Sequence, residues 1–115
     1  MTRYLVLLYE DERVWAEADE AQQAEYFRQH REYSDRAADY GVTFLASEAL
    51  QPVATAHTLR RPDGETTITE GPFAETAEQL GGFYLAEAPD VDTVLKHAHL
   101  LPAHYSIEVR EIMQL

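Results

Sequence analysis

One amphipathic segment, residues 19–41, restricts the fold of this chain more than any other. Asp19 is an N-cap candidate with Gln22 as its capping-box partner, and Gly41 stands where a left-handed C-cap residue belongs. Between them, one helical face carries residues at steps of four and three: Tyr26, His30, Tyr33, Ala37 and Tyr40. The spacing predicts a long helix with a buried aromatic face.

Segments with strand character lie on both sides of this helix. Tyr4–Tyr9 is a near-continuous apolar run, typical of a strand that is covered on both faces. Val42–Leu50 and Phe83–Ala88 also have strand character. Tyr105–Arg110 alternates apolar and polar residues, as a half-buried strand does.

Shorter segments complete the pattern. A second helix is expected from Asp90, its cap, to the proline at position 102. Glu10–Ala18 is polar and mixed, and we expect a loop or a short irregular turn there. Ala74–Leu80 has the composition for one helical turn.

A hairpin is predicted in the middle of the chain. Thr55–Arg60 and Glu65–Glu70 are rich in threonine and flank the tetrapeptide Arg61-Pro62-Asp63-Gly64. Proline presets the backbone angle φ for a turn, and glycine adopts the positive φ that closes it.

The order of elements is strand, helix, several strands, helix, strand. It predicts an α+β protein with a single domain over residues 1–115, a ferredoxin-like βαββαβ core with an antiparallel sheet, and the extra β-hairpin. Both helices would cover one face of that sheet. The other face needs a cover as well, and a second copy of the chain is the most economical one.

Acidic residues dominate the charge, since 21 Asp and Glu against 9 Lys and Arg give a formal net charge of −12. Such a surface disfavours nucleic acid and anionic membranes as partners, because binding to either is driven by lysine and arginine. The absence of cysteine excludes disulfides and thiolate catalysis. The first apolar run is too short for a signal peptide or a membrane span, so we expect a cytoplasmic protein.

Residues 70–84 carry the pattern of a known family. The motif reads Glu70-Gly71-Pro72-Phe73-Ala74-Glu75-Thr76 and then Glu78-Gln79-Leu80-Gly81-Gly82-Phe83-Tyr84. Together with Arg3–Tyr9, Gly41-Val42, Glu48-Ala49-Leu50 and Ser106–Arg110, it resembles the YCII-related proteins of DGPF type over nearly the full chain. Two residues depart from the motif: Glu70 replaces the usual Asp, and Ala77 stands where lysine is common.

The resemblance implies a dimeric α+β barrel, in which two ferredoxin-like sheets pack face to face and a cleft lies between helices and sheet. In the wider superfamily, a His on the first helix paired with an Asp near the second is proposed as an acid–base dyad. Some members eliminate halide from a hydroxylated aromatic ring. Many DGPF-type members have no established activity, and they are often encoded beside sigma factors of the extracytoplasmic-function class, so the resemblance also implies an association with such a factor.

His30 is the candidate catalytic residue. It precedes Gly41 by the spacing that the superfamily's helical His has before its own helix-ending glycine, and it also falls on the predicted apolar face. Burial among aromatic side chains lowers the pKa of an imidazole, which suits a general base. The alternative is a neutral core histidine that is hydrogen-bonded to a tyrosine or a carbonyl. The dyad's acid is missing, because Leu101 stands in its place, and Glu75 is the substitute that we consider.

Three further histidines, His97, His99 and His104, gather near the end of the second helix. Positions two apart lie about 200° apart around a helix axis, so His97 and His99 cannot chelate one ion together. A pair with His104 stays open. We nevertheless expect no metal, because histidines at a helix C-terminus interact favourably with the helix dipole and need no further explanation.

The candidate ligand-binding residues are aromatic or lie in the motif: Tyr26, Tyr33, Phe73, Glu75 and Tyr84. The tyrosines suit a cleft for a ring-shaped ligand, but packing in the core and interface is the simpler explanation for them. No cofactor motif is present. One hypothesis is a cofactor-independent, lyase- or isomerase-like enzyme that uses His30 on a small polar or aromatic metabolite. The others are a non-catalytic ligand-binding or regulatory module of a sigma-factor system, and a dimeric scaffold without a site.

Overall fold

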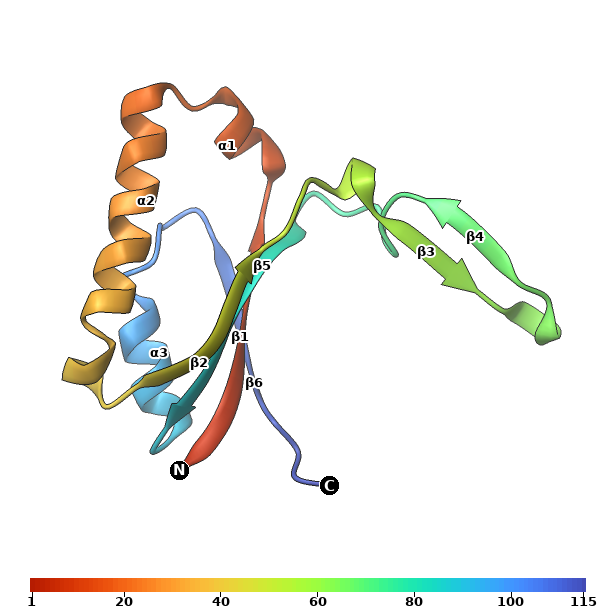
Figure 1. The fold of residues 1–115 in the computed structure, drawn as a ribbon. Coiled ribbons are helices and arrows are strands. Elements are labelled where there is room, and N and C mark those ends of the chain that lie inside the picture. The colour runs from red at the N-terminus through yellow and green to blue at the C-terminus, as the bar shows by residue number, and fades with distance from the viewer.

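The computed structural model describes residues 1–115 and contains one main antiparallel sheet. Its strand order is β2-β5-β1-β6, with the bounds β1 Thr2–Glu10, β2 Thr43–Ala49, β5 Gln79–Ala88 and β6 Ser106–Glu111. The two main helices, α2 (Glu20–Asp35) and α3 (Val91–Ala98), lie together on one face of this sheet (Figure 1). The predicted α+β class and antiparallel ferredoxin-like core are therefore confirmed.

The predicted hairpin is also confirmed, and it forms a separate two-stranded sheet. Strands β3 (His57–Arg60) and β4 (Thr67–Glu70) project away from the main sheet on the side opposite the helices (Figure 1). A short 3-10 turn, η3 (Pro62–Gly64), closes the hairpin, and another, η2 (Val53–Thr55), precedes it. Asp63 and Gly64 at the tip have φ angles of 51° and 82°.

Helix α2 begins as the sequence predicts and ends earlier. The Asp19 carboxylate accepts a hydrogen bond from the Gln22 N–H at 2.8 Å. The regular helix stops at Asp35, and the rest of the predicted stripe continues in a 3-10 turn, η1 (Ala37–Tyr40). Gly41 follows with a φ of 74°, the left-handed cap that was expected. No helix in the structure is long and apolar enough to cross a membrane.

Two sequence predictions about short segments were wrong. Residues expected to form a loop contain a helix, α1 (Glu12–Glu17), because the Asp11 carboxylate caps it through the Arg13 N–H at 3.0 Å. The helical turn expected at Ala74–Leu80 is absent. There the Gln79 side-chain amide donates to the carbonyls of residues 74 and 76, both at 3.0 Å, and holds an irregular loop before β5.

The core lies between the helices and one face of the sheet. Strand β1 alternates buried and half-buried residues, and Val6 is completely buried at its centre. Tyr33 of α2 and His97 of α3 are also completely buried. Their rings stack at 4.0 Å, and the His97 Nε2–H donates to the Tyr33 carbonyl at 2.6 Å. This stack joins the two helices above the sheet.

The other face of the sheet has no helix on it (Figure 1). In the register of β1 and β5, Leu5 lies opposite Leu85 and Leu7 lies opposite Phe83. These four side chains are only half-buried in the single chain. They form an apolar patch in the middle of the sheet, which we call the open face.

Gly81 and Gly82, which precede Phe83 on β5, allow a test of the packing between strands. A Cβ on Gly82 would lie 2.9 Å from the Glu48 carbonyl oxygen of β2, whereas a Cβ on Gly81 would meet nothing closer than 3.6 Å. We therefore expect Gly82→Ala to lower the free energy of unfolding by about 1–3 kcal/mol. Gly81→Ala should change it by less than about 1 kcal/mol. Urea denaturation at matched protein concentration measures both, and equal effects would contradict the close approach.

Candidate functional site

His30 lies on the face of α2 that is turned toward the sheet, and both of its ring nitrogens have a partner. Nδ1 is 2.7 Å from the hydroxyl of Tyr84 on β5, and Nε2 is 2.9 Å from the hydroxyl of Tyr105 just before β6. A neutral imidazole has one donor and one acceptor nitrogen. One tyrosine hydroxyl therefore accepts from the ring, and the other donates to it.

Burial sets the protonation of these groups. It lowers the pKa of His30 below its ordinary value, and the nearby His104 lowers that pKa further. Burial raises the pKa of Tyr84 and of Tyr105, so both hydroxyls keep their protons at neutral pH. The site therefore holds a neutral imidazole between two neutral phenols, an arrangement that can accept a proton at His30 and pass one through a hydroxyl.

A pair of titratable side chains, His104 and Glu10, lies next to His30 and its two tyrosines. The His104 Nε2–H donates to Glu10 Oε2 at 3.2 Å, and the two side chains are only 17% and 16% exposed. The His104 ring also packs against Tyr26 at 4.7 Å and against Tyr105 at 4.5 Å. Its Nδ1 is buried and has no hydrogen-bond partner. It is a buried polar atom without a bond, next to a His30 ring whose two nitrogens are both bonded.

The register of the sheet brings the Glu10–His104 pair next to the tyrosines that bond His30. Tyr9 of β1 lies opposite Ser106 of β6, so Glu10 at the end of β1 comes beside the segment that precedes β6. The negative charge of Glu10 adds to burial in raising the pKa of Tyr105. We call the whole group the histidine–tyrosine cluster, which comprises Glu10, Tyr26, His30, Tyr84, His104 and Tyr105.

The structure separates the candidate residues of the sequence into three places. Tyr26 and Tyr84 belong to the histidine–tyrosine cluster with His30. Tyr33 is completely buried, packs edge-on against Tyr84 at 4.8 Å, and serves the core rather than a cleft wall. Phe73 and Glu75 lie in the loop that leads from β4 to β5, and the hydrogen bonds and ring contacts of His30 go to Tyr84 and Tyr105 instead.

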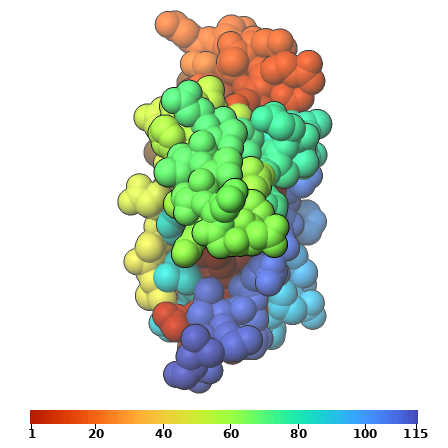
Figure 2. Space-filling view, turned by 90° about the vertical axis from the view of Figure 1, so that its right-hand side faces the viewer, coloured from red at the N-terminus to blue at the C-terminus, as the bar shows by residue number.

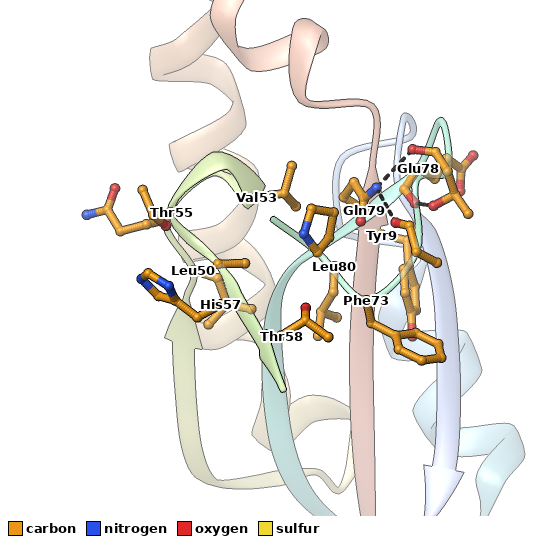
Figure 3. Close-up of a pocket in the computed structure, with 15 residues that line it drawn as sticks. Tyr9, Leu50, Val53, Thr55, His57, Thr58, Phe73, Glu78, Gln79 and Leu80 are labelled. Carbon is orange, nitrogen blue, oxygen red and sulfur yellow. Dashed lines mark hydrogen bonds between the residues drawn. The ribbon is translucent and has the colours of Figure 1, made fainter. Parts of the chain in front are cut away.

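Phe73 lines a separate groove at the base of the hairpin. The groove has a volume of about 720 Å³ and runs between the end of the main sheet and the motif loop (Figure 3). Tyr9 and Leu80 line it from the sheet, and Thr58 and Phe73 line it from the hairpin side. Arg60 donates to the Phe73 carbonyl at 2.7 Å, which ties the motif loop to the hairpin.

The three C-terminal histidines occupy different environments. His97 lies in the last turn of α3, as expected, but it is completely buried and belongs to the core stack. His99 is exposed, and its Nδ1–H donates to the Leu95 carbonyl of its own helix at 3.0 Å, as expected at a helix C-terminus. His104 joins the histidine–tyrosine cluster. Leu101, in the position of the missing acid, is buried in the core.

Sequence reasoning missed Glu10 and Tyr105 as members of the site. Glu10 offered a weak signal, since it is the first acid after an apolar strand. Tyr105 is the first residue of an alternating strand, and that pattern alone gives no sign of a site. Their proximity depends on which strands pair and in which register, and neither can be read from residue types alone.

The lowered pKa of His30 gives a direct test. At neutral pH, His30 should be uncharged and able to act as a base, and it should lose that ability as the pH falls through its lowered pKa. An NMR titration of the imidazole carbons should place the His30 midpoint below about 6.5, the ordinary value. His104→Gln should raise that midpoint, whereas His99→Gln should leave it unchanged. A His30 midpoint above 6.5 would contradict the burial of the ring.

Comparisons with known proteins identify the family. The profile of the YCII-related domain matches residues 2–115. The chain is also 39% identical over 117 residues to an uncharacterised protein of Rhizobium meliloti (strain 1021), covering 95% of this chain and 90% of that protein. The chain therefore belongs to the YCII-related domain family.

Proposed function

We propose that this YCII-related protein is a cofactor-independent acid–base enzyme in which His30 is the base. The observation that carries the proposal is the bonding of His30, whose two ring nitrogens meet the hydroxyls of Tyr84 and Tyr105. The imidazole is oriented by both contacts and kept neutral by burial. A proton taken up by His30 can pass through the Tyr105 hydroxyl toward the carboxylate of Glu10.

Glu10 takes the place of the acid that Leu101 leaves missing. Its carboxylate accepts a hydrogen bond from the His104 Nε2–H at 3.2 Å, and its negative charge raises the pKa of Tyr105. Because both side chains of this pair are largely buried, their interaction is screened little by solvent. Glu75 is not needed for this role.

The ligand that fits best is a small molecule with a hydroxyl or carbonyl group and an aromatic or similarly flat body. The buried His104 Nδ1 without a partner can bond the polar group, as acceptor or donor according to the ring's protonation. The rings of Tyr26 and Tyr105, which pack against the His104 ring, make the surroundings of this atom aromatic. Proton abstraction from such a compound leads to lyase- or isomerase-like chemistry.

Deuterium exchange tests the proposal without knowledge of the natural substrate. The wild type is incubated in D₂O with a panel of enolisable oxo acids, with and without an aryl group, and loss of the signal of the C–H next to the carbonyl is followed by NMR. We expect exchange of at least one compound, with a rate that falls at least about 100-fold in His30→Ala. The matched control His99→Ala should keep the wild-type rate. An unchanged rate in a folded His30→Ala protein would refute the role of His30.

The alternative is a non-catalytic binding module. It is favoured by one observation, since the ring nitrogens of His30 are already satisfied within the chain. A compound that shifts the His104 and Tyr105 signals without any exchange would support it. The DGPF subtype, the association with a sigma factor and the cytoplasmic location stay predictions.

We also propose that the protein acts as a homodimer. The open face places the pairs Leu5–Leu85 and Leu7–Phe83 on a sheet surface that no element of the chain covers. A single-layer sheet with one apolar face exposed is stabilised by a second layer, and a second copy related by a two-fold axis presents an identical patch to it.

Light scattering tests the dimer. At micromolar concentration we expect the wild type to have twice the mass of one chain. Leu85→Asp should shift the protein to monomer, because a carboxylate would be buried without a partner in the interface. Val91→Asp is the matched control, since Val91 is also exposed and apolar but lies at the N-terminus of α3, where an acid is tolerated. A monomeric wild type would contradict the proposal.

A further inference from the structure

We infer that the β3–β4 hairpin, residues 57–70, is a clasp that each protomer of the dimer lays against its partner. We call this hairpin the arm. The inference rests on the dimer proposed above and goes beyond it, because it assigns the arm and the groove at its base to the same interface.

The arm does not belong to the body of its own chain. It stands off the main sheet on the side of the open face (Figure 1), and in the view onto that side it projects in front of the sheet (Figure 2). The radius of gyration of the chain is 16.2 Å. A compact domain of this length has a radius of about 13 Å. The chain is thus extended in a way that a single compact domain is not.

The surface of the arm needs a cover. Leu59 of β3 lies opposite Ile68 of β4, so both side chains share one face of the hairpin. They are 57% and 66% exposed in the single chain. An isolated two-stranded hairpin is marginally stable at best in water, and packing against another surface is what stabilises it.

The groove makes the arm continuous with the open face. Tyr9, which lines the groove, lies two residues beyond Leu7 on β1, so the groove begins where the open face ends. Phe73 lies on the other wall and is 78% exposed. Figure 3 shows Tyr9 and Phe73 among the side chains that line the groove. A body that packs on the open face would therefore meet the groove and then the arm.

A second copy of the chain is the occupant that fits these surfaces. It is the body already required by the open face, and a two-fold axis makes the contact reciprocal, with each arm on the other protomer. Because the two-fold axis uses the same surfaces on both protomers, the apolar side chains of both arms are covered at once. No matching surface is left over for a third copy. The partner protomer then fills the groove, one wall of which is formed by Phe73.

Photo-crosslinking in the full-length protein tests the clasp directly. p-Benzoylphenylalanine is introduced in place of Leu59, and unlabelled and ¹⁵N-labelled chains are mixed before irradiation. We expect covalent dimers in which the arm of one chain is joined to a peptide of the other, identified by mixed isotope content. The same amino acid in place of Leu95, an exposed apolar residue on α3, should give none. Crosslinks confined to one chain, or no crosslinks at position 59, would overturn the inference.

A second measurement separates the arm from the rest of the interface. The double variant Leu59→Asp with Ile68→Asp should raise the dimer dissociation constant at least about tenfold. Leu95→Asp should leave that constant unchanged although it also adds an acid. If Leu85→Asp dissociates the dimer and the double arm variant does not, the clasp is refuted and the dimer stands. A monomeric wild type refutes both.

Removal of the arm provides a third test of the clasp. His57 and Glu70 face each other across the hairpin, and the Gly71 N–H donates to the Ala56 carbonyl at 2.7 Å. Residues 58–69 can therefore be replaced by Asn-Gly, which closes such a pair as a two-residue turn. The shortened chain should keep the fold of the body by circular dichroism and bind its copy at least about tenfold more weakly than the wild type. Unchanged dimer affinity would contradict the clasp.

Discussion

The stack between Tyr33 and His97 is the contact on which the arrangement of this molecule depends. It joins α2 to α3, and its hydrogen bond from an imidazole to a main-chain carbonyl fixes the rotation of α2 about its own axis. His30 lies three residues before Tyr33 on the same helical face, so that rotation also decides whether His30 reaches the sheet. The core and the candidate site are consequently set by one helix orientation.

The features that the sequence predicts well are local. The caps at Asp19 and Asp90 are hydrogen bonds to an N–H three residues later, at 2.8 and 2.9 Å, and need nothing from the rest of the fold. The helix α1 escaped prediction because six residues carry too little periodicity to distinguish a helix from a loop. The loop before β5 was mistaken for a helical turn because its order comes from one glutamine side chain.

The candidate site was only half predictable, for a physical reason. Helical spacing places His30 on the inner face, and its pKa falls because that face is buried. The contact between Glu10 and His104 joins residues that are 94 positions apart, and it exists only because β1 pairs with β6 in one register. Phe73 and Glu75 attracted attention through the family motif, but that motif holds the base of the arm instead of the histidine–tyrosine cluster.

The hydrogen bond between Gly71 and Ala56 has a consequence for how such a protein changes over generations. Because the chain leaves the body and returns to it at this one point, the arm is an insertion whose ends are already joined. Insertions, deletions or surface substitutions in the arm therefore need not change the register of the main sheet or the position of His30. In the proposed dimer, substitutions in the arm can therefore alter which chain a protomer pairs with, without changing the residues of the proposed acid–base site beneath α2.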